Sequence, residues 1–280
     1  MKIAIITDSG SGLVSYGDVY VLPLQILVNE KTYLDGVDLT NHQFYDLLET
    51  GIVSKTSLPT PKMIEDTIID LQAKGYEAVI AIPLSSGLSS TMQTICMVCH
   101  EYQIPVYPVE CFSTCNIQKY LVQIAHEYVH QGLNPNEIVE ILNQKIEHSA
   151  SLIFPTDLEY LKRGGRLTPL ASSLAGLLKI KPLLVLGPNT DGKIDVKSKV
   201  RTEKKVAKLV LDELENKLKD GREYKVFVIH ARKDEEATLF CDYLKKRLKD
   251  VVCEVSMDEI GAVITSHTGL GCIACQFIEK

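Results

Sequence analysis

The sequence predicts an α/β fold with two domains, an N-terminal layered α/β domain with a mainly parallel sheet and a C-terminal α/β domain with a mixed sheet. With 280 residues and 45% hydrophobic composition, the chain can bury a sizeable core and is long enough for two domains of ordinary size. Strand-like apolar runs alternate with helical periodicity through the first half, and the pattern changes character near residue 150. We therefore expect domains at 1–150 and 151–280.

The first half alternates strands and helices in the order that a parallel sheet requires. The predicted strands are Lys2–Thr7, Val19–Leu27, Ala78–Leu84 and Val106–Val109. The predicted helices are His42–Glu49, Pro61–Lys74, Thr91–Tyr102 and Ile117–Gln131, followed by one that starts at Asn134-Pro135-Asn136 and runs towards His148.

The pattern of the second half predicts strands and two longer helices. The turn from Gly187 to Gly192 joins two of these strands. The predicted strands are Leu152–Phe154, Pro182–Leu186, Lys193–Val200, Lys225–Ile229 and Val252–Ser256, and the helices lie near Thr202–Lys219 and Glu235–Leu248.

Charge and hydropathy exclude several classes of function. The formal charge of −6 and the pI near 5.7 argue against general binding to nucleic acid or to an anionic membrane. The chain begins on a strand with no signal-peptide pattern, and Pro83 and Gly87 interrupt the charge-free window from Ala78 to Cys99. We expect a cytoplasmic protein with no integral membrane segment.

The eight cysteines contain two C-x-x-C pairs, Cys96 with Cys99 and Cys272 with Cys275. This spacing occurs in zinc sites. The neighbouring residues are apolar, which favours small buried thiols on helices. We expect no metal site, with metal or redox use of these thiols as the alternative.

Two clusters of hydroxyl side chains precede predicted helices. Ser85-Ser86-Gly87-Leu88-Ser89-Ser90-Thr91 follows a buried strand, and Thr56-Ser57-Leu58-Pro59-Thr60-Pro61 precedes the helix that Thr60 is expected to cap. Unpaired N–H groups at a helix N-terminus attract phosphate or carboxylate. The alternative is that these hydroxyls only cap helices, but Thr56 and Ser57 are left free for a ligand.

Two further stretches in the second half carry polar chemistry. Leu161-Lys162-Arg163-Gly164-Gly165-Arg166-Leu167 pairs glycines with cations, and Ser266-His267-Thr268-Gly269-Leu270-Gly271 places a histidine between a strand and a turn. Each stretch alone also fits a solvated loop or a structural histidine.

Taken together, these pieces resemble the DegV family of bacterial fatty-acid-binding proteins. The resemblance rests on motifs in family order along the whole chain: Thr7-Asp8-Ser9, Tyr33-Leu34-Asp35-Gly36, Thr56-Ser57-x-Pro59, Ser85-Ser86-x-Leu88-Ser89-x-Thr91, Leu161-x-x-Gly164-Gly165-Arg166, Lys181-Pro182, Arg201 and His267-x-Gly269-x-Gly271. Ser90 and Leu270 depart from it, because the family usually has glycine and proline there.

The resemblance implies one long-chain fatty acid in an interior tunnel, with the ligand site between the two domains. Ser57 and Ser89 would donate hydrogen bonds to its carboxylate near the backbone of Ser90, and Thr56, Arg166 and His267 would complete the network. A separate fatty acid kinase would convert the presented carboxylate into an acyl phosphate for phospholipid synthesis. The chain would then have no catalytic residue and no cofactor of its own. Long apolar stretches such as Leu170–Leu186 are candidates for the tunnel wall.

The segment from residue 160 to 205 is strongly basic, with eleven lysines and arginines against three acidic residues. We expect part of it, Arg201 especially, to dock the acidic kinase that the resemblance implies, whereas the alternative is an ordinary solvated face.

Two other functions stay open from sequence. One is a serine-dependent acyl hydrolase that uses Ser89, His267 and an acid such as Asp8, although no G-x-S-x-G motif surrounds Ser89. The other is a small phosphate- or sugar-binding protein that uses the helix N-termini alone.

Overall fold

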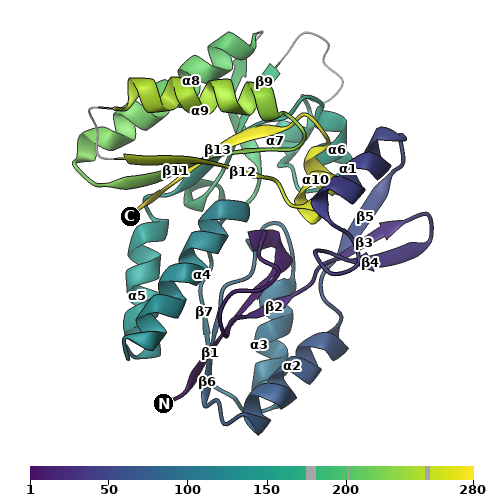
Figure 1. Ribbon diagram of the computed structural model, residues 1–280, viewed down its shortest axis with the longest axis vertical. Helices are drawn as coiled ribbons and strands as arrows, with labels where there is room; N and C mark the ends of the chain where they lie inside the picture. The colour runs from purple at the N-terminus through teal and green to yellow at the C-terminus, as the bar shows by residue number, and fades with distance from the viewer. Residues whose placement is uncertain (175–180, 201, 250–252) are drawn as a thin grey trace.

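The computed structural model describes residues 1–174, 181–200, 202–249 and 253–280. Their strands form a four-stranded sheet, a six-stranded sheet and a small three-stranded sheet (Figure 1). The fold class is the predicted α/β arrangement, with a parallel first sheet and a mixed second sheet.

The four-stranded sheet is parallel throughout and has the strand order β2-β1-β6-β7. Its central strands are almost entirely apolar and buried, as expected for a sheet covered on both faces. Helices α2 and α3 cover one face, while α4 and α5 cover the other (Figure 1). The elements are β1 (Ile3–Asp8), β2 (Tyr20–Leu22), α2 (Pro61–Ala73), β6 (Ala78–Ala81), α3 (Thr91–Glu101), β7 (Val106–Pro108), α4 (Cys115–His130) and α5 (Pro135–Ile146).

The six-stranded sheet has the order β10-β9-β8-β13-β11-β12, and only β11 and β12 pair in parallel. Helices α8 and α9 pack on one face, and α4 and α5 contact β13 from the opposite side, so this helix pair lies between the two large sheets (Figure 1). The elements are β8 (Ala150–Phe154), β9 (Lys181–Leu186), β10 (Asp195–Val200), α8 (Glu203–Lys217), β11 (Tyr224–His230), α9 (Asp234–Arg247), β12 (Cys253–Glu259) and β13 (Ile273–Glu279).

The three-stranded antiparallel sheet β4-β3-β5 and four helices lie beside the carboxyl end of the parallel sheet (Figure 1). Three 3-10 turns complete the described structure. These elements are η1 (Ser9–Ser11), β3 (Gln25–Val28), β4 (Lys31–Leu34), α1 (Asn41–Glu49), β5 (Ser54–Ser57), α6 (Leu158–Gly164), α7 (Pro169–Ser172), η2 (Pro188–Thr190), η3 (Leu218–Asp220) and α10 (Ala262–Thr268).

Three sequence predictions about elements are wrong. The expected strand Val19–Leu27 is divided between β2 and β3, which belong to different sheets, because Pro23 supplies no N–H for a continuous ladder. Cys272 and Cys275 lie next to and within strand β13, not on a helix, although both are buried as expected. His267 lies on helix α10 rather than after a strand, because tertiary packing overrides the strand preference of Val263-Ile264-Thr265.

Candidate functional site

A cavity of about 460 Å³ opens where β5, the loop before α3, the end of α6 and helix α10 meet. Its walls come from both halves of the chain. The six residues predicted to bind the ligand all line it: Thr56, Ser57, Ser89, Ser90, Arg166 and His267.

The two hydroxyl clusters differ in how their side chains relate to the helix that follows. Thr60 Oγ1 accepts a hydrogen bond from Met63 N at 3.2 Å and caps α2, as predicted, so Thr56 and Ser57 are not needed there. Ser90 occupies the N-cap position of α3, but its side chain forms no capping hydrogen bond. Ser89 Oγ lies 2.8 Å from Thr91 Oγ1.

The loop before α3 has one unpaired backbone donor at the cavity. From Ser85 to Thr91, within the described part of the chain, the N–H of Ser90 alone forms no hydrogen bond, while its neighbours bond to Ser113, Glu110, Ser85 and Ser89. An N–H at the start of an 11-residue helix favours an anionic acceptor.

The buried side chain of Asp8 holds this loop in place through hydrogen bonds. Its Oδ2 accepts a hydrogen bond from Leu84 N at 3.1 Å, and its Oδ1 accepts from Gly10 N and Gln118 Nε2, both at 3.0 Å. Burial of the carboxyl raises the pKa of Asp8 to about 7. Asp8 therefore braces the cavity wall and is not among the residues that line it.

His267 is held by a hydroxyl and faces a cation. Its Nε2 lies 2.7 Å from Thr56 Oγ1. The pKa of His267 is lowered to about 4, mainly because burial removes solvent from the imidazole and to a smaller extent because of the charge of Arg166. The imidazole is therefore neutral at physiological pH and can accept or donate a single hydrogen bond at each nitrogen according to its tautomer.

Arg166 brings the positive charge of the cavity. Its Nε donates to the carbonyl of Leu88 at 3.3 Å, and its Nη1 donates to the carbonyl of Gly164. Burial lowers the pKa of Arg166, but arginine remains protonated at any physiological pH. The guanidinium is thus fixed between the loop before α3 and the end of α6.

Gly164 explains part of the Gly-Gly-Arg motif. A Cβ at this position would lie 2.5 Å from His267 Nδ1, so only glycine lets the end of α6 approach the imidazole ring this closely. Gly165 then caps α6 in the left-handed conformation, and the chain turns so that Arg166 enters the cavity.

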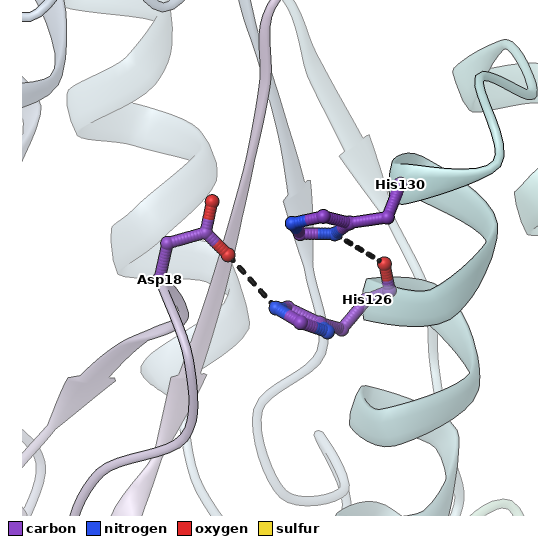
Figure 2. A group of neighbouring side chains, drawn as sticks. All are labelled: Asp18, His126 and His130. Atoms are coloured by element: carbon purple, nitrogen blue, oxygen red, sulfur yellow. Dashed lines mark hydrogen bonds and ion pairs between the residues drawn. The ribbon is translucent and has the colours of Figure 1, made fainter.

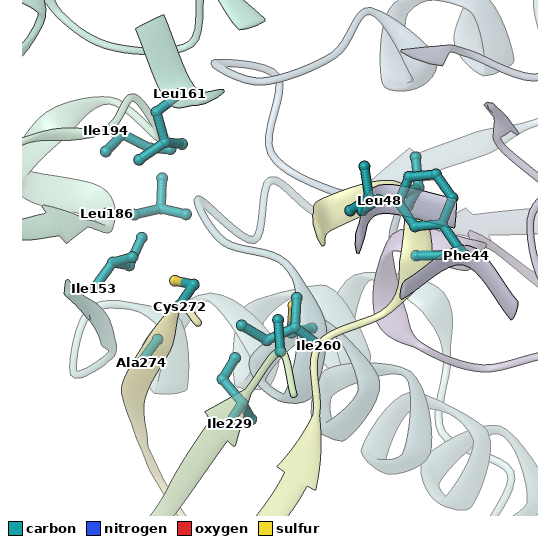
Figure 3. Close-up of a cluster of buried hydrophobic side chains, with 14 of the residues drawn as sticks. Phe44, Leu48, Ile153, Leu161, Leu186, Ile194, Ile229, Ile260, Cys272 and Ala274 are labelled. Carbon is teal, nitrogen blue, oxygen red and sulfur yellow. The ribbon is translucent and has the colours of Figure 1, made fainter. Parts of the chain in front are cut away.

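The apolar residues of the cavity were not identified individually from sequence. Ile153, Leu161, Leu186 and Ile194 gather on one side of a single buried cluster (Figure 3). Leu186 belongs to the predicted stretch Leu170–Leu186, of which residues 175–180 lie outside the described structure. No signal in the sequence distinguishes these side chains from ordinary core residues, because both are apolar and buried.

A second depression, of about 420 Å³, adjoins the first cavity. It shares Thr56, Arg166 and His267 with the first cavity and adds the exposed cations Lys55 and Arg163. These three side chains, the polar cluster, therefore line both the first cavity, with its apolar residues, and this second, outer depression, with its exposed cations.

The side chains of the hydrolase alternative do not form a catalytic relay. Ser89 bonds to Thr91, His267 bonds to Thr56, and Asp8 bonds to backbone N–H groups and Gln118. A nucleophile, base and orienting acid would have to be joined to one another. Arg201, the predicted docking residue, lies outside the described residues.

The cavity and its α/β scaffold define a class of small-ligand-binding protein, and sequence comparison gives the family. The model of the DegV family, described as an uncharacterised protein family, matches residues 2–280. DegV domain-containing proteins from Streptococcus pyogenes serotype M1 and Halalkalibacterium halodurans are each 32% identical to this chain, over 98% and 100% of its length and 98% and 99% of theirs. The chain belongs to the DegV family.

Solved structures of this family share the whole fold. A fatty-acid-binding DegV family protein from Streptococcus agalactiae superposes with a TM-score of 0.91 at 33% identity, covering 100% of this chain and 99% of the other. DegV from Bacillus subtilis, a fatty acid binding protein, has a TM-score of 0.88 at 28% identity, and each chain is covered completely. Both relatives are thus described as binding fatty acids.

Among the helices of the described residues, none combines the length and the apolar composition needed to cross a bilayer.

Proposed function

We propose that this chain binds one long-chain fatty acid and presents its carboxylate to a separate kinase. The observation that carries the proposal is the cavity itself, whose lining combines hydroxyls, one free N–H and one arginine with a group of leucine and isoleucine side chains. Its volume lies within the range of about 300–1,000 Å³ that is usual for small-molecule sites.

In this proposal the head group is recognised by donors that suit a carboxylate. Ser57 and Ser89 donate through their hydroxyls and Ser90 through its N–H, while Arg166 supplies the opposite charge. Hydrogen bonds to a charged acceptor are stronger than neutral ones, and they offset the loss of solvation of a buried carboxylate. Thr56 orients His267, which remains neutral and completes the polar end.

The apolar end supplies most of the affinity. Each buried methylene contributes about 0.8 kcal/mol, so a long acyl chain gains more free energy than the head group does. A free phosphate or sugar would leave Ile153, Leu161 and Leu186 facing a polar ligand, which makes the phosphate- or sugar-binding alternative the weaker one. The named function of the Streptococcus agalactiae and Bacillus subtilis relatives supports the fatty acid proposal.

The head-group assignment is tested by titrating delipidated protein with oleate in a calorimeter. Ser57→Ala/Ser89→Ala removes both hydroxyl donors, and affinity should fall roughly 100-fold. Ser198→Ala on β10 is the matched control, since Ser198 is half-buried and does not line the cavity. Equal affinity in the double variant and the control would contradict the assignment.

The outer depression supports a role as a presenting subunit rather than an enzyme. A kinase that approaches through this depression would reach the polar cluster from its outer side, next to Lys55 and Arg163. The product would be an acyl phosphate that enters phospholipid synthesis, and the nucleotide and its metal would belong to the kinase. We place this exchange in the cytoplasm, where ATP is available.

The docking part of the proposal concerns the basic segment from 160 to 205, with Arg201 as its main contact. Arg201→Glu should abolish phosphorylation of the bound lipid by the partner kinase while the lipid content of the protein stays unchanged. Lys31→Glu, an exposed cation on β4 outside the segment, is the control and should retain phosphorylation. Loss of both lipid and phosphorylation in Arg201→Glu would contradict docking at this residue.

A further inference from the structure

Two histidines one helical turn apart face a carboxylate at the surface, and none of the three belongs to the motifs that line the cavity. His126 and His130 lie on the same side of α4 at i and i+4, and Asp18 reaches them from the loop before β2 (Figure 2). One ligand atom from each of the three side chains lies within 4.8 Å of the others. None of the three lines the 460 Å³ cavity.

The hydrogen bond of His130 fixes which of its nitrogens is free. Nδ1 lies 2.9 Å from the carbonyl oxygen of His126, and because a carbonyl can only accept, Nδ1 must carry the proton (Figure 2). In the neutral imidazole, Nε2 then presents a lone pair. A backbone carbonyl is one of the usual outer partners of a metal-binding histidine.

In His126 the nitrogen Nε2 has no hydrogen-bond partner in bonding geometry. Its Nε2 is buried and forms no hydrogen bond among the described residues, although Asp18 Oδ1 lies 2.9 Å away. Gly17 makes this approach of the loop feasible, because a Cβ there would lie 2.5 Å from the same nitrogen. Tyr16 packs its ring edge-on against the imidazole, with 5.1 Å between the ring centroids.

We propose that Asp18, His126 and His130 bind one divalent transition-metal ion such as Zn²⁺. Two neutral imidazoles and one carboxylate are ligands that zinc accepts, and three protein ligands leave a further position for water. Asp18 is exposed and the two histidines lie beside a surface hollow, so the ion can enter from solvent. Its binding ties the loop before β2 to helix α4.

The test is calorimetric titration of metal-free, full-length protein with ZnCl₂ in a buffer that binds zinc weakly. Wild type should bind one Zn²⁺ per chain, and His130→Ala should bind at least about tenfold more weakly, since even loss of an outer partner costs that much. His100→Ala is the matched control, because His100 is likewise an exposed histidine in the last turn of a helix, and it should bind as wild type does.

Thermal unfolding with and without ZnCl₂ gives a second readout. Zinc should raise the melting temperature of wild type and His100→Ala but not of His130→Ala, which keeps its fold because His130 is exposed. Asp18→Asn should weaken binding less than His130→Ala, since the amide oxygen remains a ligand. Undiminished zinc binding in His130→Ala would place the ion elsewhere and overturn the proposal, and so would the absence of zinc binding to wild type.

Discussion

His267 and the pair His126 and His130 are the same residue type in opposite surroundings. His267 is largely buried, bonds to the hydroxyl of Thr56 and faces the guanidinium of Arg166. His126 and His130 lie beside the carboxylate of Asp18 at the surface (Figure 2). In both places a glycine leaves room for a ring, Gly164 in the first and Gly17 in the second.

The difference teaches that the neighbouring charge decides what a histidine can bind. A fixed cation next to His267 favours an anionic ligand and opposes a metal ion. A carboxylate next to His126 does the reverse. The two sites should therefore respond separately to mutation.

The largest effect is expected when the charge of the first site is reversed. Arg166→Glu places a carboxylate where the ligand carboxylate should lie, and oleate affinity should fall about 1,000-fold or more, because juxtaposed like charges cost several kcal/mol. Titration with oleate measures this. Arg163→Glu is the control, since Arg163 is exposed outside the 460 Å³ cavity, and its affinity should change less than about threefold. Similar losses in the two variants would mean that only the net charge of the region matters.

An intermediate effect is expected on the pH dependence of stability. The pKa of His267 is lowered from 6.5 to about 4 in the folded protein, so between these values the unfolded chain binds a proton that the folded chain does not. Wild type should therefore lose stability as the pH falls from 6.5 towards 4, and His267→Gln should lose less. The difference should be about 2 kcal/mol at pH 5.

Urea unfolding of both proteins at pH 7 and pH 5 measures that difference. The raised pKa values of Asp8 and Asp35 act in the opposite direction, stabilising the fold at low pH, but they are present in both proteins and cancel in the comparison. A constant gap between wild type and His267→Gln at the two pH values would show that His267 titrates normally in the folded state.

The smallest effect is expected from the glycine that contacts His267. Gly164→Ala adds a Cβ 2.5 Å from Nδ1, so the ring must shift, which disturbs its hydrogen bond with Thr56. Oleate affinity should fall about tenfold, as for the loss of one hydrogen bond at the head group. Gly261→Ala is the control, because a Cβ at the start of α10 meets open space. If Gly164→Ala binds oleate like Gly261→Ala, the position of His267 is unimportant for the ligand.

Much of the fold could be predicted because local signals agree with the tertiary structure. The buried strands β1 and β6, the Thr60 cap with Pro61 and the turn from Gly187 to Gly192 are all as expected. Strand β13 was not predicted, although it lies in the middle of the six-stranded sheet. Its side chains are buried on both faces and it follows a glycine turn, and periodicity does not distinguish such a run from a buried helix.

Of the residues that line the candidate site, only polar ones were predicted individually from the sequence. Hydroxyls before helices and a Gly-Gly-Arg turn are unusual enough to be noticed, and Thr56, Ser89 and Arg166 do line one cavity. The apolar wall gave no signal, because Ile153 and Leu186 would be apolar in any core. The group of His126, His130 and Asp18 was not predicted, because Asp18 lies far from the two histidines in sequence and only the fold brings it to them.

The central claim is that a fatty acid occupies the cavity, and native mass spectrometry of freshly purified wild-type protein tests it most directly. The spectrum should show a chain that carries one fatty acid, and solvent extraction should release that acid for identification. A ligand-free chain that also fails to take up added oleate would contradict the claim.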